Sequence, residues 1–339
     1  MNRVTVVLLI AVLLSLSACA GGSPAPSVAP STAIPQATVP LKTGTLRIAS
    51  PSTDLDDIPL WVALDTLKQQ GYVVETTEYA RFDLVTAALA SGDLDIAPSS
   101  QQTAWAAIAQ GASIRAVVGS RRNPYVVVAK AEIKACADLQ GKSIAYSTTS
   151  NALAALSNGY LKENCPGTEP QITVIPSSSN RMAALQSGGV DAALLDEEDA
   201  LQLERQAPGK FHVLCYLAEE FPQVDTGAFY VHNDFAANHP EIVKDFVMAV
   251  VQANRRVQDS QILHEAIERY LPDNANALEN ADTYLAHKAW DVNGGLTSER
   301  IQHTLAFLTD AGVVPSGLQA EQLSDPSYLN TVLDEIGRK

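Results

Sequence analysis

One short sequence pattern occurs twice in this chain and predicts its architecture. Residues 87–97 read AALASGDLDIA, and residues 183–193, which lie 96 positions later, read AALQSGGVDAA. Each copy has small and apolar residues at helical spacing, then a glycine that can close a helix in the left-handed conformation. A short apolar run of the kind that forms a buried strand follows. Because a helix that leads directly into a buried strand is half of an α/β unit, the repeat predicts two similar lobes, each with its own sheet.

The segments around both copies also alternate between strand and helix patterns, which argues against a chance match of common helix-end residues. Strands separated by helices of about ten residues indicate α/β lobes with mostly parallel sheets covered on both faces. We expect residues 44–130 and 225–339 to form the first lobe and residues 131–224 to form the second. The two crossings, near residues 126–130 and 226–230, would then form a hinge.

The composition fits a globular protein of this size. The 339 residues allow about two domains of ordinary size. An apolar content of 46 % is sufficient for large cores. The formal charge of −15 makes nucleic acid and anionic membrane surfaces poor partners.

The N-terminus has the features of an exported lipoprotein. Arg3 precedes an apolar run over residues 4–14, and the sequence LSAC that ends at Cys19 resembles a bacterial lipobox. We therefore predict a signal peptide over residues 1–18 and lipidation of Cys19, the alternative being an ordinary secretory signal with an incidental cysteine. Residues 19–43 are rich in Ser, Pro, Ala and Thr and are expected to form a disordered tether. The predicted location is extracytoplasmic, with the lipid anchored in the cell membrane.

Three cysteines remain after the lipidation site, and export favours disulfides. Cys136 and Cys165 both lie beside loops of the second lobe, and we expect them to be bonded. Cys215 lies within the apolar run FHVLCYL, which favours a buried free thiol. No Cys or His spacing typical of a metal site occurs.

Several segments together resemble the bacterial solute-binding proteins of ABC transporters: the lipobox, ALASGDLDIA, ADLQGKSIAYS, AALQSGGVDAALLD and HPEIVKDFVMAVVQAN. Within these, the chain is most similar to the NMT1/THI5-like group, whose ligands include nitrate, sulfonates, taurine, thiamine pyrimidine precursors and riboflavin. The resemblance covers roughly residues 44–315. It implies a two-lobed, type II periplasmic-binding-protein fold that closes on its ligand about a hinge. It also implies a monomer without a cofactor that delivers a small solute to ABC permease subunits.

Ligands of open α/β sheets bind beyond the carboxyl ends of the strands, where loops and helix N-termini converge. This rule selects the polar loops that follow the predicted strands of both lobes, together with the aromatic residues beside them. The candidate ligand-binding residues are Asp54, Asp56, Asp57, Trp61, Arg81, Phe82, Ser99, Ser100, Gln101, Tyr125, Ser147, Thr148, Thr149, Asn151 and Asp196.

These candidates also have structural interpretations. The aspartates after the first strand can cap the following helix and complement its dipole, and Ser, Thr and Asn are expected at helix starts. Trp61 can lie in the core, and Tyr125 can offer a stacking face beside the hinge or belong to the core. Arg81 is the only obvious cation in the first-lobe loops, which argues against a strongly anionic solute. We assign Asp95 and Asp191, the aspartates of the repeat, to structure.

Hydroxyls, carboxylates and the rings of Trp61, Phe82 and Tyr125 suit a flat heteroaromatic solute with hydroxyls or an amine. We therefore predict a vitamin-type solute, with riboflavin ahead of a thiamine pyrimidine precursor. The alternative is an aliphatic sulfonate, taurine or nitrate held at helix N-termini. We do not expect an enzyme, because the chain lacks the Cys-rich segment of the eukaryotic THI5 enzymes, a second zincin histidine and a G-x-S-x-G elbow. A ligand-sensing lipoprotein that docks a membrane sensor would share the same features.

Overall fold

The computed structural model describes residues 42–79 and 81–339. The predicted signal peptide, the lipidation site Cys19 and the predicted tether up to residue 41 lie outside the described residues. Lys42, near the end of the predicted tether, already contacts the folded part, since its N–H donates to the carbonyl of Gln70 at 2.8 Å. Within the described residues, tertiary contacts therefore include Lys42, two positions before the predicted start of the first lobe at residue 44.

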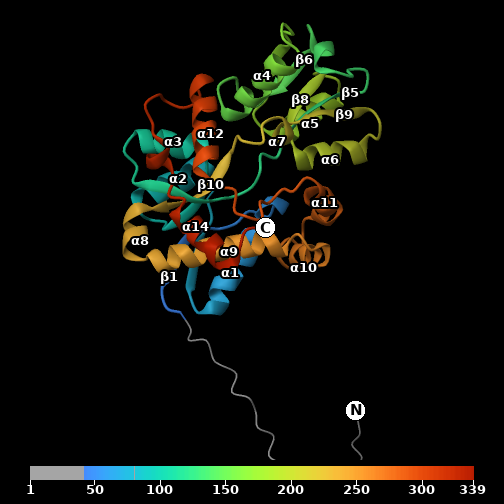
Figure 1. Cartoon of the computed structure of the whole chain (residues 1–339). Helices are drawn as coiled ribbons and strands as arrows, with labels where there is room; N and C mark the ends of the chain where they lie inside the picture. The colour runs from blue at the N-terminus through green and yellow to red at the C-terminus, as the bar shows by residue number, and fades with distance from the viewer. Residues whose placement is uncertain (1–41, 80) are drawn as a thin grey trace, which may run out of the picture. The chain divides into compact units, whose positions relative to one another are not determined.

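The described residues contain two five-stranded sheets, one in each lobe (Figure 1). The first sheet has the order β2-β1-β3-β10-β4, and the second has the order β7-β6-β8-β5-β9. In each sheet the pairs among the first three strands are parallel, and the fourth strand pairs antiparallel to both neighbours. Four strands of each sheet thus run in one direction, as the mostly parallel α/β prediction requires. The strands are β1 (Thr45–Ala49), β2 (Val73–Thr77), β3 (Ile96–Ser100), β4 (Ile114–Gly119) and β10 (Gly227–His232) in the first sheet, and β5 (Tyr125–Lys130), β6 (Ser143–Tyr146), β7 (Gln171–Val174), β8 (Ala192–Asp196) and β9 (Phe211–Tyr216) in the second.

The helices flank these sheets, and the C-terminal third of the chain returns to the first lobe (Figure 1). Among the described helices, none is both long and apolar enough to cross a membrane. The helices of the first lobe are α1 (Ile58–Gln70), α2 (Phe82–Ser91), α3 (Gln101–Ala109), α8 (Asn233–Asn238), α9 (Pro240–Arg256), α10 (Ser260–Tyr270), α11 (Ala275–Ala286), α12 (Ser298–Asp310), α13 (Ala320–Leu323) and α14 (Ser327–Ile336), with the 3-10 turn η1 (Leu55–Asp57). Those of the second lobe are α4 (Ala152–Asn164), α5 (Ser178–Gln186), α6 (Glu197–Gln206) and α7 (Leu217–Glu220), with the 3-10 turn η2 (Cys136–Leu139).

The two copies of the repeat form the same local structure. In the first copy, α2 ends at Gly92 and the chain enters β3; in the second, α5 is followed by Gly188 and the chain enters β8. Both glycines have φ of +79°, a left-handed conformation that side chains with a Cβ rarely adopt. The repeated Ser-Gly therefore marks the turn from helix to central strand in both lobes.

The repeated aspartates hold the neighbouring strand in place, as predicted for Asp95 and Asp191. The carboxylate of Asp95 accepts a hydrogen bond from the backbone N–H of Arg47 on β1 at 2.7 Å and pairs with the guanidinium of the same residue. The carboxylate of Asp191 accepts from the backbone N–H of Ser143 on β6 at 2.9 Å and pairs with Lys130 at 2.7 Å. Each contact joins residues 48 positions apart, so the two lobes repeat in register.

The chain crosses between the sheets at slightly different places than the sequence suggests. Residues 126–130 were expected to end the first lobe, but they lie in β5, which pairs with β8 and β9 of the second sheet. The first crossing is therefore the segment 120–124, between β4 and β5. The second crossing lies between α7 and β10, at residues 221–226, just before the predicted position. A purely apolar sequence is compatible with a strand of either sheet, which explains why β5 was assigned to the first lobe instead of the second.

The core of the second lobe lies on both faces of its sheet. Val127 and Leu194 belong to one apolar cluster, whereas Val126 and Leu195 belong to another. This follows from the two-residue period of a strand, and it explains why β5 and β8 are continuously apolar. The same lobe carries the predicted disulfide between η2 and the end of α4, which closes a loop with a sequence separation of 29. Cys215 is a buried free thiol, as expected, and burial raises its pKa.

Candidate functional site

A cavity of about 260 Å³, which we call the solute cavity, lies at the carboxyl ends of β1, β3 and β4 in the first lobe. This is the edge of the sheet where α/β proteins bind ligands. Its polar lining comes from the loop after β1, the end of β3 and the two crossings, while α1, α9 and β10 contribute an apolar floor. The lining residues are Ser52, Asp54, Asp56, Asp57, Pro59, Leu60, Pro98, Ser99, Ser100, Ser120, Arg121, Tyr125, Thr226, Gly227, Phe229, Val250 and Asn254.

Local hydrogen bonds shape the loop that carries the three predicted aspartates. The carboxylate of Asp57 accepts from the backbone N–H of Ser52 at 2.7 Å and so closes the loop just before α1. Burial raises the pKa of Asp57, and the hydrogen bonds from Ser52 oppose this. Asp54 is exposed, whereas Asp56 and Asp57 are partly buried. All three line the cavity. Asp54 and Asp57 stand at the N-cap positions of η1 and α1, but their side chains make no capping hydrogen bond there.

One guanidinium lies among these carboxylates. Arg121, in the first crossing, forms an ion pair with Asp56, and both side chains line the solute cavity. Carboxylates of the second lobe face the same group, because Arg121 lowers the pKa of both Asp196 and Glu198, whose pKa values burial raises. Glu198 also accepts a hydrogen bond from the backbone N–H of Leu55 at 3.3 Å, across the two lobes. Acidic groups from both lobes therefore surround Arg121, and Arg181 of the second lobe also lowers the pKa of Asp196.

The residues at the carboxyl end of β3 and the start of α3 divide into two groups. Ser99 and Ser100 line the cavity, and Ser100 also caps α3 by accepting from the N–H of Thr103 at 3.1 Å. Gln101 is buried in the core, where it accepts a hydrogen bond from the hydroxyl of Tyr230. Tyr125, at the start of β5, lines the cavity and is partly buried, and burial raises its pKa.

Three predicted residues near the first lobe's edge lie elsewhere. Trp61 stacks on Tyr270 with ring centroids 5.6 Å apart and is not among the residues that line the solute cavity. Arg81 is exposed and pairs with Asp83, two residues away. The side chain of Phe82 lies outside the described residues.

The second-lobe candidates around the start of α4 do not line the solute cavity. Asn151 caps α4 through the N–H of Ala154 at 2.9 Å, and its amide donates to the hydroxyl of Ser147 at 3.1 Å. The N–H of Ala152 donates to Gln102 of α3 at 3.1 Å, so this turn contacts the first lobe directly. Ser147, Thr148, Thr149 and Asn151 are not among the residues that line the cavity, and neither is Asp196, which acts on it through charge.

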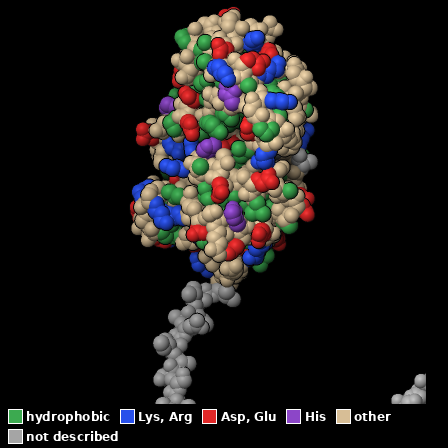
Figure 2. Space-filling model, turned by 90° about the vertical axis from the view of Figure 1, so that its right-hand side faces the viewer, with side chains coloured by type: hydrophobic (Ala, Val, Ile, Leu, Met, Phe, Trp, Pro, Cys, Tyr) green, Lys and Arg blue, Asp and Glu red, His purple; other side chains and the backbone are tan. Residues whose placement is uncertain are grey.

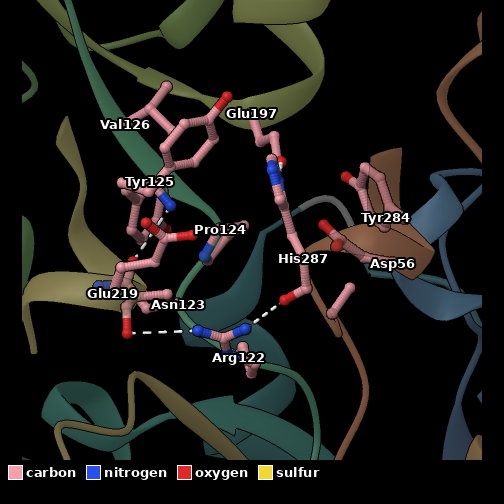
Figure 3. A pocket seen from close by; sticks show the side chains of 13 residues that line it. Asp56, Arg122, Asn123, Pro124, Tyr125, Val126, Glu197, Glu219, Tyr284 and His287 are labelled. Carbon is pink, nitrogen blue, oxygen red and sulfur yellow. Dashed lines mark hydrogen bonds and ion pairs between the residues drawn. The ribbon is translucent and has the colours of Figure 1, made fainter. Parts of the chain in front are cut away.

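A smaller cavity of about 20 Å³, which we call the hinge junction, lies beside the first crossing (Figure 3). Arg122 donates to the carbonyl of His287, and the imidazole of His287 contacts the carboxylate of Glu197 from the second lobe. Burial raises the pKa of Glu197, while His287 lowers it. Asp56 and Tyr125 line both cavities, so the solute cavity and the hinge junction share two walls.

Comparisons with known proteins agree with this architecture. The NMT1/THI5-like family matches residues 64–259, which is more than half of the chain. The chain belongs to this family. A taurine-binding periplasmic protein of Escherichia coli (strain K12) is 26 % identical over 270 residues, covering 74 % of this chain and 81 % of the relative.

Solved structures show the same fold. A periplasmic sulfonate-binding protein from Methylobacillus flagellatus matches with a TM-score of 0.70 and 19 % identity, over 87 % of this chain and 95 % of the other. The aliphatic sulphonate binding protein of Escherichia coli matches with a TM-score of 0.66 and 19 % identity, over 83 % and 92 % of the two chains. The nitrate-binding protein of Synechocystis PCC 6803 matches with a TM-score of 0.61 and 12 % identity, over 87 % and 89 %.

These findings confirm the type II two-lobed fold and the NMT1/THI5-like resemblance. They also confirm that this family member is a solute-binding component of an ABC importer and not an enzyme. The extracytoplasmic location agrees with its periplasmic relatives.

Sequence reasoning missed several cavity residues of this NMT1/THI5-like protein. Ser120 and Arg121 directly follow β4, so the same carboxyl-end rule applies to them. Thr226 ends the second crossing, Gly227 begins the antiparallel strand β10 at this edge, and Asn254 lies in α9. No local pattern marks these last three, because they reach the cavity only through the tertiary fold.

Proposed function

We propose that this protein captures a small zwitterionic solute, with a protonated amine and an anionic group, and delivers it to an ABC permease. An aminosulfonate such as taurine represents this class. The observation that carries the proposal is the set of carboxylates from both lobes around one guanidinium at the solute cavity.

Charge explains why an amine is required. Asp54, Asp56 and Asp57 come from the first lobe, Asp196 and Glu198 face them from the second, and Arg121 supplies the balancing cation. Carboxylates brought together repel one another, and a protonated amine in the cavity reduces that repulsion. Plain sulfonate or nitrate would add negative charge to this group.

The anionic end of the solute has two sources of attraction. Arg121 lines the cavity, and α3 begins beside it at Ser100, so its N-terminal dipole favours negative charge at this edge. The taurine-binding relative supports the same class, since taurine carries both charges.

Size also favours a small solute. Cavities for drug-sized ligands measure about 300–1,000 Å³, and the solute cavity measures about 260 Å³. Riboflavin is the second candidate, because Tyr125 and Phe229 both line the cavity and offer aromatic surface. Trp61, which was predicted to stack on the solute together with Phe82 and Tyr125, is already paired with Tyr270, which weakens this candidate.

Isothermal titration of residues 20–339 with taurine, ethanesulfonate and riboflavin tests the proposal. We expect taurine to bind at least about tenfold more tightly than ethanesulfonate, since a hydrogen bond to a charged group contributes about 1.5–3 kcal/mol. Glu198→Gln should weaken taurine binding, whereas the matched change Glu163→Gln, on the exposed face of α4, should leave it unchanged. Equal affinities for taurine and ethanesulfonate would contradict the proposal, and tight riboflavin binding would replace it with the second candidate.

We also propose that the mature protein is anchored to the membrane by lipid on Cys19 and that the predicted tether leads from it to Lys42, where contacts with the folded part are seen. The lipobox-like sequence and the uncharged composition before Lys42 support this. Labelling with palmitate should fail in Cys19→Ala, and the protein should then leave the membrane fraction; retention of label would disprove the anchor.

A further inference from the structure

The floor of the solute cavity contains one polar side chain whose acceptor atom is unused. Asn254 lies on α9, is 1 % exposed and lines the cavity. Its Nδ2 donates to the carbonyl of Asp291 at 2.9 Å. Its Oδ1 has no hydrogen-bond partner within the described part of the chain.

The bond to Asp291 fixes which atom is available. A carbonyl oxygen can only accept, so the amide must present its nitrogen to Asp291 and its oxygen elsewhere. Buried acceptors of this kind normally have partners, and an unpaired one destabilises the protein. Such an atom at a ligand cavity therefore indicates a group supplied by the ligand.

The apolar surroundings of Asn254 allow it to distinguish solutes that carry a hydrogen-bond donor from solutes that do not. Leu60, Val250 and Phe229 line the same floor and offer no hydrogen bonds from their side chains. The charged residues lie instead in the loop after β1 and in the first crossing, at the carboxyl edge of the sheet. The inner end of a solute thus meets apolar surface with one acceptor.

We propose that Asn254 is a specificity-determining residue: its Oδ1 accepts a hydrogen bond from a donor, a protonated amine or a hydroxyl, on the end of the solute that enters the first lobe. This rests on the proposed function. A solute that ends in a methyl group there leaves Oδ1 unpaired. Sites built around a hydrogen bond discriminate strongly against analogues that lack it.

The test compares three solutes that differ at one end: taurine with an amine, isethionate with a hydroxyl and ethanesulfonate with a methyl group. Titrations use residues 20–339 as the native sequence, as Asn254→Leu and as Asn254→Asp. We expect the native protein to prefer taurine and isethionate over ethanesulfonate by about 10- to 100-fold. Asn254→Leu should reduce the preference for isethionate over ethanesulfonate to less than about threefold. The preference for taurine should fall by a similar factor but persist in part, because the carboxylates still attract the amine, and the control Asn330→Leu, on the exposed face of α14, should keep both preferences.

Asn254→Asp covers the case in which the leucine variant does not fold. Its carboxylate keeps an acceptor and adds a negative charge, so the preference for taurine over isethionate should rise. Asn254 has only a structural role if Asn254→Leu weakens the binding of all three solutes equally. The same conclusion follows if Asn254→Asp leaves the ratio of the taurine and isethionate affinities unchanged. Failure of the native protein to bind any of the three would overturn the proposed function as well, which separates the two failures.

Discussion

The second crossing contains a buried carboxyl group whose protonation should control stability. Asp225 lies just before β10 and is 8 % exposed. Its carboxylate pairs with the guanidinium of Arg300 on α12, and its backbone N–H donates to the hydroxyl of Thr304 at 3.0 Å. Burial is the main effect and raises the pKa of Asp225 to about 6, although Arg300 opposes it.

The size and sign of the effect follow from this pKa. The ordinary value is 3.8 and the folded value about 6. At 1.36 kcal/mol for each pH unit, the difference corresponds to about 3 kcal/mol. The folded protein binds this proton more tightly than the unfolded chain. The contribution to stability is therefore fully present below about pH 4 and is lost as the pH rises through about 6.

Asp225→Asn isolates this contribution, because an amide cannot ionise. Denaturant unfolding of both proteins at pH 4, 5, 6 and 7 gives the difference in their free energies of unfolding at each pH. We expect the native protein to lose about 2.4 kcal/mol relative to the variant between pH 4 and pH 7, because part of the full effect lies below pH 4. Asp282→Asn, an exposed carboxyl on α11, controls for the loss of one surface charge. A difference that stays constant with pH, or that changes in the opposite direction, would refute the reasoning.

Two further predictions concern stability. Replacing both Cys136 and Cys165 by serine opens a loop with a separation of 29, which should lower the free energy of unfolding by about 3–4 kcal/mol. The melting temperature should then fall by several degrees while solute affinity is unchanged; an unaltered melting temperature would show that the disulfide is not stabilising. Asp95→Asn should cost about 2–3 kcal/mol and Asp191→Asn about 1–2 kcal/mol, because Asp95 is the more buried of the two repeated aspartates. Chemical denaturation of both variants measures this, and a larger loss for Asp191→Asn would contradict it.

The sequence predicts the fold well because the fold repeats local rules. Ser-Gly ends a helix before a central strand twice, and Asp95 and Asp191 sit at matching positions, so two lobes can be inferred without any tertiary information. The boundary at residue 130 was wrong because the apolar pattern of β5 suits either sheet. The pairing of β5 with β8 decides to which lobe β5 belongs, and this pairing cannot be inferred from the local sequence pattern.

The site is predictable only in part, for a related reason. Asp54, Asp56, Asp57, Ser99, Ser100 and Tyr125 line the cavity because the carboxyl ends of parallel strands share one edge. Trp61 was also predicted but does not line the cavity, because its ring lies against Tyr270, a residue more than two hundred positions away. Asn254 was not predicted, since its acceptor becomes significant only when α9 is known to lie under the sheet edge.

Arg121 and Arg122 show how the cavity and the hinge are connected. These consecutive residues have different partners: Arg121 pairs with Asp56 at the solute cavity, and Arg122 donates to the carbonyl of His287 at the hinge junction (Figure 3). The backbone carbonyl of Asp56 also accepts from the indole of Trp290 at 3.0 Å, only three residues beyond His287. On the face shown in Figure 2, acidic and basic side chains are interspersed. Asp56 lines both the solute cavity and the hinge junction. A charged group of the solute that interacts with Asp56 therefore also affects the hinge junction. The electrostatic interactions that select the solute are thus suited to hold the two lobes together.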